Sequence, residues 1–252
     1  MNRPVALPII VFVIASAVAS PLLAKAQDLA ALDPNVLRLT VFSTAVGALV
    51  VWLVWRKALR SLPVNTSGFD RSLLFAVGAC LLAIGIAVAL AKFENAPWRG
   101  PKAGSLGAPL VVVLIVQLLG AAAEEVGWRG LVQPLLETRL AAWMAALVTG
   151  ALFGLGHFYL AFGVAPLSFG LFLVSAVAIS MILALATLGR SIWERIVIAT
   201  LLHYLLNMAT LFLFSDGDGG VRYFADLAVA FGICGALASI PLILRRGAVA
   251  ET

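Results

Sequence analysis

Long apolar runs, separated by short polar segments, dominate the pattern of this chain of 252 residues. A helix that crosses a bilayer needs about 20 mainly apolar residues, and eight runs come close to or exceed that length. We therefore predict an all-α, polytopic membrane protein with about eight transmembrane helices. The predicted spans are residues 5–24, 36–55, 72–92, 108–137, 141–160, 167–188, 196–214 and 224–244.

The segments between these runs hold much of the proline, glycine and charge. Residues 62–68 (LPVNTSG) and 95–101 (NAPWRGP) have the composition of loops. The sequence shows no internal repeat, no low-complexity tail and no soluble segment of domain size. We therefore expect one integral-membrane domain over residues 1–252.

The first predicted span has two readings. Arg3, the apolar run after it and Ala24-Lys25-Ala26 also fit a signal peptide with a small-residue cleavage site. The run from Val5 to Ala24 is longer than most signal-peptide cores, so we favour a retained span.

Composition agrees with a membrane protein and argues against a nucleic-acid binder. The chain is 63% hydrophobic and 12% charged, whereas soluble domains are about half apolar and a quarter charged. The net charge of +5 comes from basic residues that stand singly or in short groups between apolar runs. That distribution is typical of residues that orient membrane helices, and we expect the lipid bilayer, not nucleic acid, to be the partner.

The distribution of Lys and Arg predicts the orientation. With a cytoplasmic N-terminus, ten basic residues fall on the cytoplasmic side and six on the other. Cytoplasmic loops of membrane proteins carry the excess of Lys and Arg, so both termini are expected in the cytoplasm. The compact chain with minimal loops indicates a bacterial cytoplasmic membrane.

A few strongly polar side chains lie within the predicted spans, away from their ends. Ionisable groups at this depth cost a few kcal/mol each and mark function by default. The polar residues are Glu124, Glu125, Arg129, His157, His203 and Asn207, with Gln117 and Gln133 on the same span as the glutamates. Both histidines of the chain are in this set.

The spacing within each span indicates which side chains can act together. Glu125 and Arg129 are four residues apart, so they share a helical face and can neutralise each other. Glu124 points about 100° away around the axis, and a histidine is its natural partner. At 1.5 Å per residue, the polar residues of all three spans fall in the middle region of the membrane.

Each polar residue also has a structural reading. The pair of Glu125 and Arg129 could be a clasp, a single histidine could join two helices, and Asn207 could be a hydrogen bond between helices. Gly150 and Gly154 form a small-residue face that is typical of helix packing. The clustering of two glutamates, both histidines and an asparagine on three spans favours a functional site.

Three short motifs resemble those of one known family. EEVGWR (124–129) matches E-E-x-x-x-R, FGLGH (153–157) matches F-x-x-x-H, and HYLLN (203–207) matches H-x-x-x-N. In this order, on the fourth, fifth and seventh spans, they resemble the CPBP family. That family comprises CAAX prenyl endopeptidases of the Ras-converting type and bacterial bacteriocin-processing or self-immunity proteins. The motif-bearing core covers about residues 108–214.

The resemblance implies an intramembrane glutamic protease that hydrolyses a peptide bond in a membrane-associated protein or peptide. Glu124 would be the general base that activates a water, helped by His157, and His203 and Asn207 would form the oxyanion hole. Glu125, Arg129 and Phe153 would support the site. The chemistry is suitable, since an oxyanion needs preorganised donors in a dry site.

Three alternatives remain. A non-catalytic relative would bind a peptide as an immunity or scaffold protein. A proton-coupled transporter also uses glutamate and histidine, but it predicts polar groups through the whole membrane depth. Zinc held by glutamate and histidine is the alternative mechanism, although the chain has no H-E-x-x-H motif. We expect no cofactor and no metal.

Overall fold

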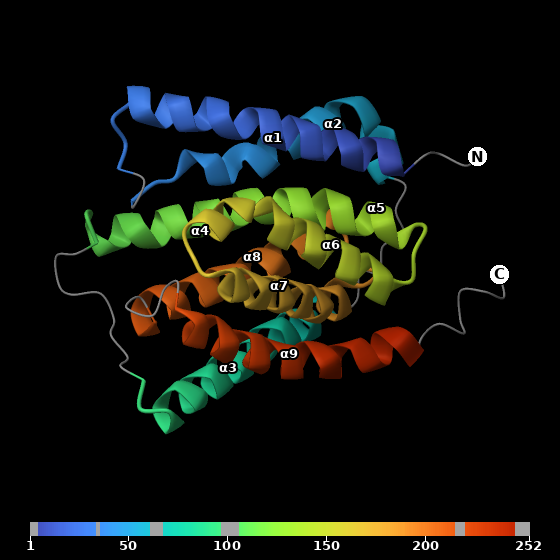
Figure 1. Ribbon diagram of the computed structural model, residues 1–252. Helices are drawn as coiled ribbons and strands as arrows, with labels where there is room; N and C mark the ends of the chain where they lie inside the picture. Colours follow the sequence, from blue (N-terminus) through green and yellow to red (C-terminus); the bar gives the residue numbers. More distant parts are fainter. Residues whose placement is uncertain (1–4, 34–35, 61–67, 97–105, 215–219, 245–252) are drawn as a thin grey trace. The chain divides into compact units, whose positions relative to one another are not determined.

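The computed structural model describes residues 5–33, 36–60, 68–96, 106–214 and 220–244, and within these ranges the chain forms helices and no strand (Figure 1). Among the described residues, seven helical segments are long and apolar enough to cross a membrane. They are Ala6–Leu29, Leu39–Arg56, Phe69–Phe93, Leu110–Glu137, Pro166–Thr187, Ile192–Leu213 and Val221–Leu244. The prediction of an all-α, polytopic membrane protein is confirmed, and the eighth predicted span is the shorter apolar helix Ala142–Gly156.

The helices gather into two compact units. The first consists of Met1–Ser67, Lys102–Arg139 and Gly189–Tyr204, and the second of Gly68–Pro101, Leu140–Leu188 and Leu205–Thr252. The first unit holds α1 (Ala6–Leu29), η1 (Leu39–Phe42), α2 (Ser43–Arg60), α4 (Leu110–Gly127), η2 (Trp128–Val132) and α5 (Gln133–Glu137). The second holds α3 (Phe69–Phe93), α6 (Ala142–Gly156), η3 (Phe158–Phe162), α7 (Pro166–Thr187) and α9 (Val221–Leu244). Helix α8 (Ile192–Leu213) contributes its first part to one unit and its second part to the other.

In the first unit, α2 packs against both α1 and α4. Phe12 of α1 is almost fully buried and meets the ring of Trp128 edge to face, with ring centroids 5.2 Å apart. A Cβ atom on Gly127 would come within 2.7 Å of the Phe12 ring. The glycine therefore makes room for an aromatic side chain beside the first motif.

In the second unit, α7 lies against α6 and α9, and both interfaces depend on glycine. A Cβ on Gly150 would come within 2.6 Å of the Cα of Val177, and one on Gly235 within 2.8 Å of the Cα of Ala178. Small residues let helix backbones approach closely in a membrane, where dispersion forces drive association. The packing role predicted for Gly150 and Gly154 is confirmed, since a Cβ on Gly154 would meet Leu173.

The sequence predicts one span over residues 108–137. In the structure this segment is not one continuous α-helix. A π-helical turn, Trp128–Val132, separates α4 from α5, and the backbone N–H of Gln133 donates to the carbonyl of Trp128, five residues back. Pro134 gives the physical reason. In an α-helix its ring would clash with the carbonyl of the residue four positions back, Gly130, and would leave that carbonyl without its donor.

The fifth span is shorter than the predicted 141–160. Helix α6 ends at Gly156, His157 is its C-cap with φ −93° and ψ 22°, and the chain continues as the 3₁₀ turn η3. Fifteen helical residues rise about 22 Å, which is less than the roughly 30 Å of a hydrocarbon core. His157 therefore lies at the end of a helix and not inside one.

Helix α8 begins with a capping box. The Ser191 hydroxyl accepts from the backbone N–H of Glu194 at 3.3 Å, and the Glu194 carboxylate accepts from the backbone N–H of Ser191 at 2.9 Å. Reciprocal bonds of this kind satisfy two backbone donors at a helix start. They fix where α8 begins and, with it, the register of His203 and Asn207.

Candidate functional site

Glu125 and Arg129 form a buried ion pair within the fourth span. The Nη1 of Arg129 donates to both oxygens of the Glu125 carboxylate, at 3.1 and 2.9 Å. Each residue is only 1% exposed. The pairing predicted from the four-residue spacing is therefore confirmed, and it holds across the beginning of the π-helical turn.

His203 of α8 lies beside both glutamates of the first motif. Its Nδ1 is 2.8 Å from Oε1 of Glu125, and its Nε2 is 3.7 Å from Oε2 of Glu124. A carboxylate oxygen can only accept, so Nδ1 carries the hydrogen that it shares with Glu125. The expectation that a histidine would stand next to Glu124 is met, within this unit, by His203.

These four side chains form a series of contacts in which basic and acidic groups alternate. Arg129 contacts Glu125, Glu125 contacts His203, and His203 faces Glu124. Burying single charges is expensive, and a buried carboxylate persists only where cations and donors compensate it. The Glu125 carboxylate has both, and it anchors the imidazole of His203, whose Nε2 lies 3.7 Å from Oε2 of Glu124.

Helix α2 supports this cluster through residues that the sequence did not single out. The hydroxyl of Thr44 donates to the carbonyl of Ala123, the residue before Glu124, at 3.1 Å.

Helix α8 packs its Ile196 side chain closely against the π-helical turn, where a Cβ on Gly130 would come within 3.0 Å of that side chain. Gly127 and Gly130 lie in and beside the motif, and their position was the available sequence signal for close packing.

A second polar network lies at the end of α5. Gln133, which is fully buried, donates from Nε2 to Oε1 of Glu137 at 2.9 Å. Oε2 of Glu137 accepts from Nη2 of Arg195 at 2.7 Å, and Nε of Arg195 donates to the carbonyl of Arg190. This network ties the start of α8 to the end of α5 and so helps to place His203 beside the glutamates.

The second unit carries His157 and Phe153. The Nδ1 of His157 lies 3.0 Å from the carbonyl oxygen of Phe153, and the two rings are in contact at 4.8 Å between centroids. Asn207 follows His203 by one turn of α8 and belongs to the same unit as His157. Cooperation of His157 and Asn207 with Glu124 stays a prediction.

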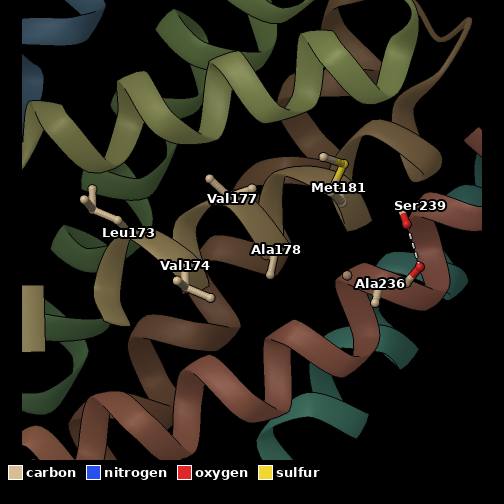
Figure 2. Close-up of a pocket in the computed structure, with 8 residues that line it drawn as sticks. Leu173, Val174, Val177, Ala178, Met181, Ala236 and Ser239 are labelled. Atoms are coloured by element: carbon tan, nitrogen blue, oxygen red, sulfur yellow. Dashed lines mark hydrogen bonds between the residues drawn. The ribbon is translucent and has the colours of Figure 1, made fainter. Parts of the chain in front are cut away.

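The second unit also contains an apolar cavity of about 410 Å³ between α7 and α9 (Figure 2). Its lining residues are Leu173, Val174, Val177, Ala178, Met181, Gly235, Ala236 and Ser239. The Ser239 hydroxyl donates to the carbonyl of Ala236 on its own helix, as Figure 2 shows. No motif residue lines this cavity, and its chemistry does not suit hydrolysis. Within the residues that the structure describes, no three His, Cys, Asp or Glu side chains are gathered so that they could hold a metal ion.

Comparison with known proteins agrees with the three motifs. Residues 106–209 match the family model described as type II CAAX prenyl endopeptidase Rce1-like, a range that contains all three. The chain is also similar to lysostaphin resistance protein A of two strains of Staphylococcus epidermidis, with 31% identity over 150 residues in each case. These matches cover 58% of this chain and 38% of the length of each relative. The resemblance to the CPBP family is confirmed.

Proposed function

We propose that this membrane protein, Rce1-like over residues 106–209, is an intramembrane endopeptidase that cleaves a peptide bond with a glutamate-activated water. The observation that carries the proposal is the buried cluster in which His203 stands between Glu124 and Glu125, with Glu125 held by Arg129. Such a cluster is costly in a membrane, and a packing role alone does not require two carboxylates and an imidazole in contact.

Glu124 is the general base in this proposal. Its carboxylate takes a proton from a water while the water oxygen bonds to the carbonyl carbon of the substrate. The tetrahedral intermediate then collapses, the bond between carbon and nitrogen breaks, and the proton passes to the departing amine. By the family resemblance, His157 helps Glu124 to activate this water.

His203 and Asn207 are the proposed oxyanion donors. They stand one turn apart on α8, so both side chains can face the same side. Because Nδ1 of His203 is engaged with Glu125, donation to an oxyanion must come from Nε2. The ring must then be an imidazolium, with both nitrogens protonated. Glu125 and Arg129 are the groups that orient it.

The substrate in this proposal is a membrane-associated protein or peptide, and the enzyme needs no cofactor. We place the protein in a bacterial cytoplasmic membrane with both termini in the cytoplasm, in line with the distribution of Lys and Arg. The second candidate is a non-catalytic peptide-binding protein. The name of the relatives, lysostaphin resistance protein A, favours it, because a resistance protein need not be an enzyme.

The two candidates differ in one experiment. Cells that carry the wild-type chain or its Glu124→Ala variant are compared for the N- and C-termini of their membrane proteins and peptides. A protease produces termini that depend on Glu124, and these also identify the substrate. Equal sets of termini, with the variant inserted at wild-type level, would refute the protease and leave the binding protein.

A further inference from the structure

The end of α6 is closed by the side chain of His157. The last four carbonyls of an α-helix have no donor within the helix. The Phe153 carbonyl would normally accept from the backbone N–H of residue 157, but that N–H donates to the carbonyl of Gly154 at 3.1 Å. Nδ1 of His157 takes its place, 3.0 Å from the Phe153 oxygen. The imidazole therefore caps the helix from which it projects.

This contact determines the tautomer. A backbone carbonyl can only accept, so Nδ1 must carry the hydrogen. A neutral imidazole has one N–H, and Nε2 is then the nitrogen with the lone pair. The hydrogen bond made by one ring nitrogen commonly sets the state of the other. His157 can therefore accept at Nε2 while its cap stays intact.

Aromatic rings fix the plane of the same imidazole. Its ring centroid lies 4.8 Å from that of Phe153, 5.4 Å from that of Phe172 and 5.8 Å from that of Tyr159. Phe172 approaches edge to face and is itself held by Phe169 and Phe224. Rotation of the imidazole out of this plane would break the hydrogen bond to Phe153 and at least one of these ring contacts.

We propose that the carbonyl of Phe153 and the rings of Phe172 and Tyr159 position His157 so that its Nε2 acts as a hydrogen-bond acceptor. The proposal rests on the protease function. It makes Phe172 and Tyr159 positioning residues outside the three motifs. It also gives the two histidines different roles, because His157 is anchored to a neutral carbonyl whereas His203 is anchored to a carboxylate and faces a second one.

The first test is spectroscopic and needs no substrate. The full chain, labelled with ¹⁵N-histidine in lipid bilayers, contains only two imidazoles, and a His203→Gln variant assigns the remaining signals to His157. At the pH at which the Glu124-dependent termini form fastest, or at neutral pH if none form, we expect a protonated Nδ1 and an unprotonated Nε2. A protonated Nε2, in the other tautomer or in an imidazolium, would overturn the proposal.

The second test uses matched phenylalanine variants on α7. Phe172→Leu removes a ring that touches His157, whereas Phe169→Leu removes a ring whose described contacts are with Phe158 and Phe172. An aromatic contact contributes about 0.5–1.5 kcal/mol, so we expect Phe172→Leu to slow termini formation by about threefold to tenfold. Its His157 spectrum should show mixed tautomers. Phe169→Leu should change the spectrum and the rate less than Phe172→Leu does, because the described contact of Phe169 with His157 runs only through Phe172.

The outcomes separate the positioning from the function. Equal spectra and rates in the Phe172 and Phe169 variants would refute positioning by the ring. Rescue of both readouts by Phe172→Tyr, which keeps an aromatic ring, would support it. A wild-type spectrum with protonated Nδ1, together with no Glu124-dependent termini, would support the positioning of His157 and refute the protease.

Discussion

Oε1 of Glu125 lies 2.8 Å from Nδ1 of His203, and the same carboxylate accepts two hydrogen bonds from Arg129. The glutamate is therefore shared between a cation on its own span and an imidazole on another helix. A change at Arg129 is therefore transmitted through one carboxylate to His203, the proposed oxyanion donor. The stability of the fold and the geometry of the site thus depend on the same contact.

Arg129→Met should destabilise the protein strongly, because it leaves the buried Glu125 carboxylate without its cation. Breaking a buried ion pair by removing one partner costs about 3–5 kcal/mol, and thermal unfolding in detergent measures the change. Arg222→Met is the control. It removes the half-exposed pair between Arg222 and Glu94, and exposed pairs contribute about 0–1 kcal/mol. Equal losses in the two variants would contradict the importance of the buried pair.

Gly235→Ala should weaken the interface between α7 and α9. The new methyl group would lie 2.7 Å from the carbonyl oxygen of Ala178, and overpacking costs about 1–3 kcal/mol. Gly232 is on the same helix, but a Cβ there has nothing within 4 Å. Gly232→Ala should therefore be neutral or should stabilise by up to about 1 kcal/mol through helix propensity. The two unfolding temperatures should move in opposite directions or differ clearly in size, and equal shifts would argue against the close approach.

Asn207→Leu should lower the rate of cleavage with little effect on insertion or folding. Loss of one oxyanion donor costs about 10²–10³-fold in kcat, and the rate at which Glu124-dependent termini form measures it. Leu205, two positions before Asn207 on α8, provides a control in the variant Leu205→Ile. A wild-type rate for Asn207→Leu would remove the asparagine from the oxyanion hole.

Chelation should leave the activity unchanged if a carboxylate activates the water. We expect the same rate of terminus formation in isolated membranes before and after treatment with a zinc chelator. The control is a zinc protease assayed in the same membranes. Loss of activity that added Zn²⁺ restores would instead favour the zinc mechanism over the glutamic one.

The all-helical, membrane-spanning character of the chain was predictable because lipid imposes a simple rule. Backbone polar groups must be satisfied within each spanning segment, so a span appears as a long apolar run. The ion pair of Glu125 and Arg129 was also predictable from local sequence. Both residues belong to one span, and residues four positions apart on a helix are neighbours on its surface. Neither prediction required knowledge of how the helices pack.

The other features depend on packing or on local breaks in the helix. His203 reaches both glutamates because α8 approaches the π-helical turn at Gly130, and no spacing along the chain encodes that approach. Helix α6 ends at Gly156 and not at residue 160. At this end, Nδ1 of His157 takes the place of the backbone N–H that would donate to the carbonyl of Phe153. Pro134 is the sequence signal for the π-helical turn. A span predicted by counting apolar residues does not register the break that a proline makes in a helix.

Because the fourth span contains the π-helical turn Trp128–Val132, we expect the effect of deleting one residue to depend on where in the span the residue lies. A π-helical turn contains one residue more than the α-helical turn that it replaces. Deletion of Val132, combined with Pro134→Ala to remove the ring that would clash in a regular α-helical turn, would leave the flanking helices in phase. Deletion of Leu118 from α4 would instead rotate all preceding residues by about 100° relative to the glutamates. In the Pro134→Ala background, a scan of single-residue deletions along this span should therefore find its most permissive position in the π-helical turn, next to the most polar segment.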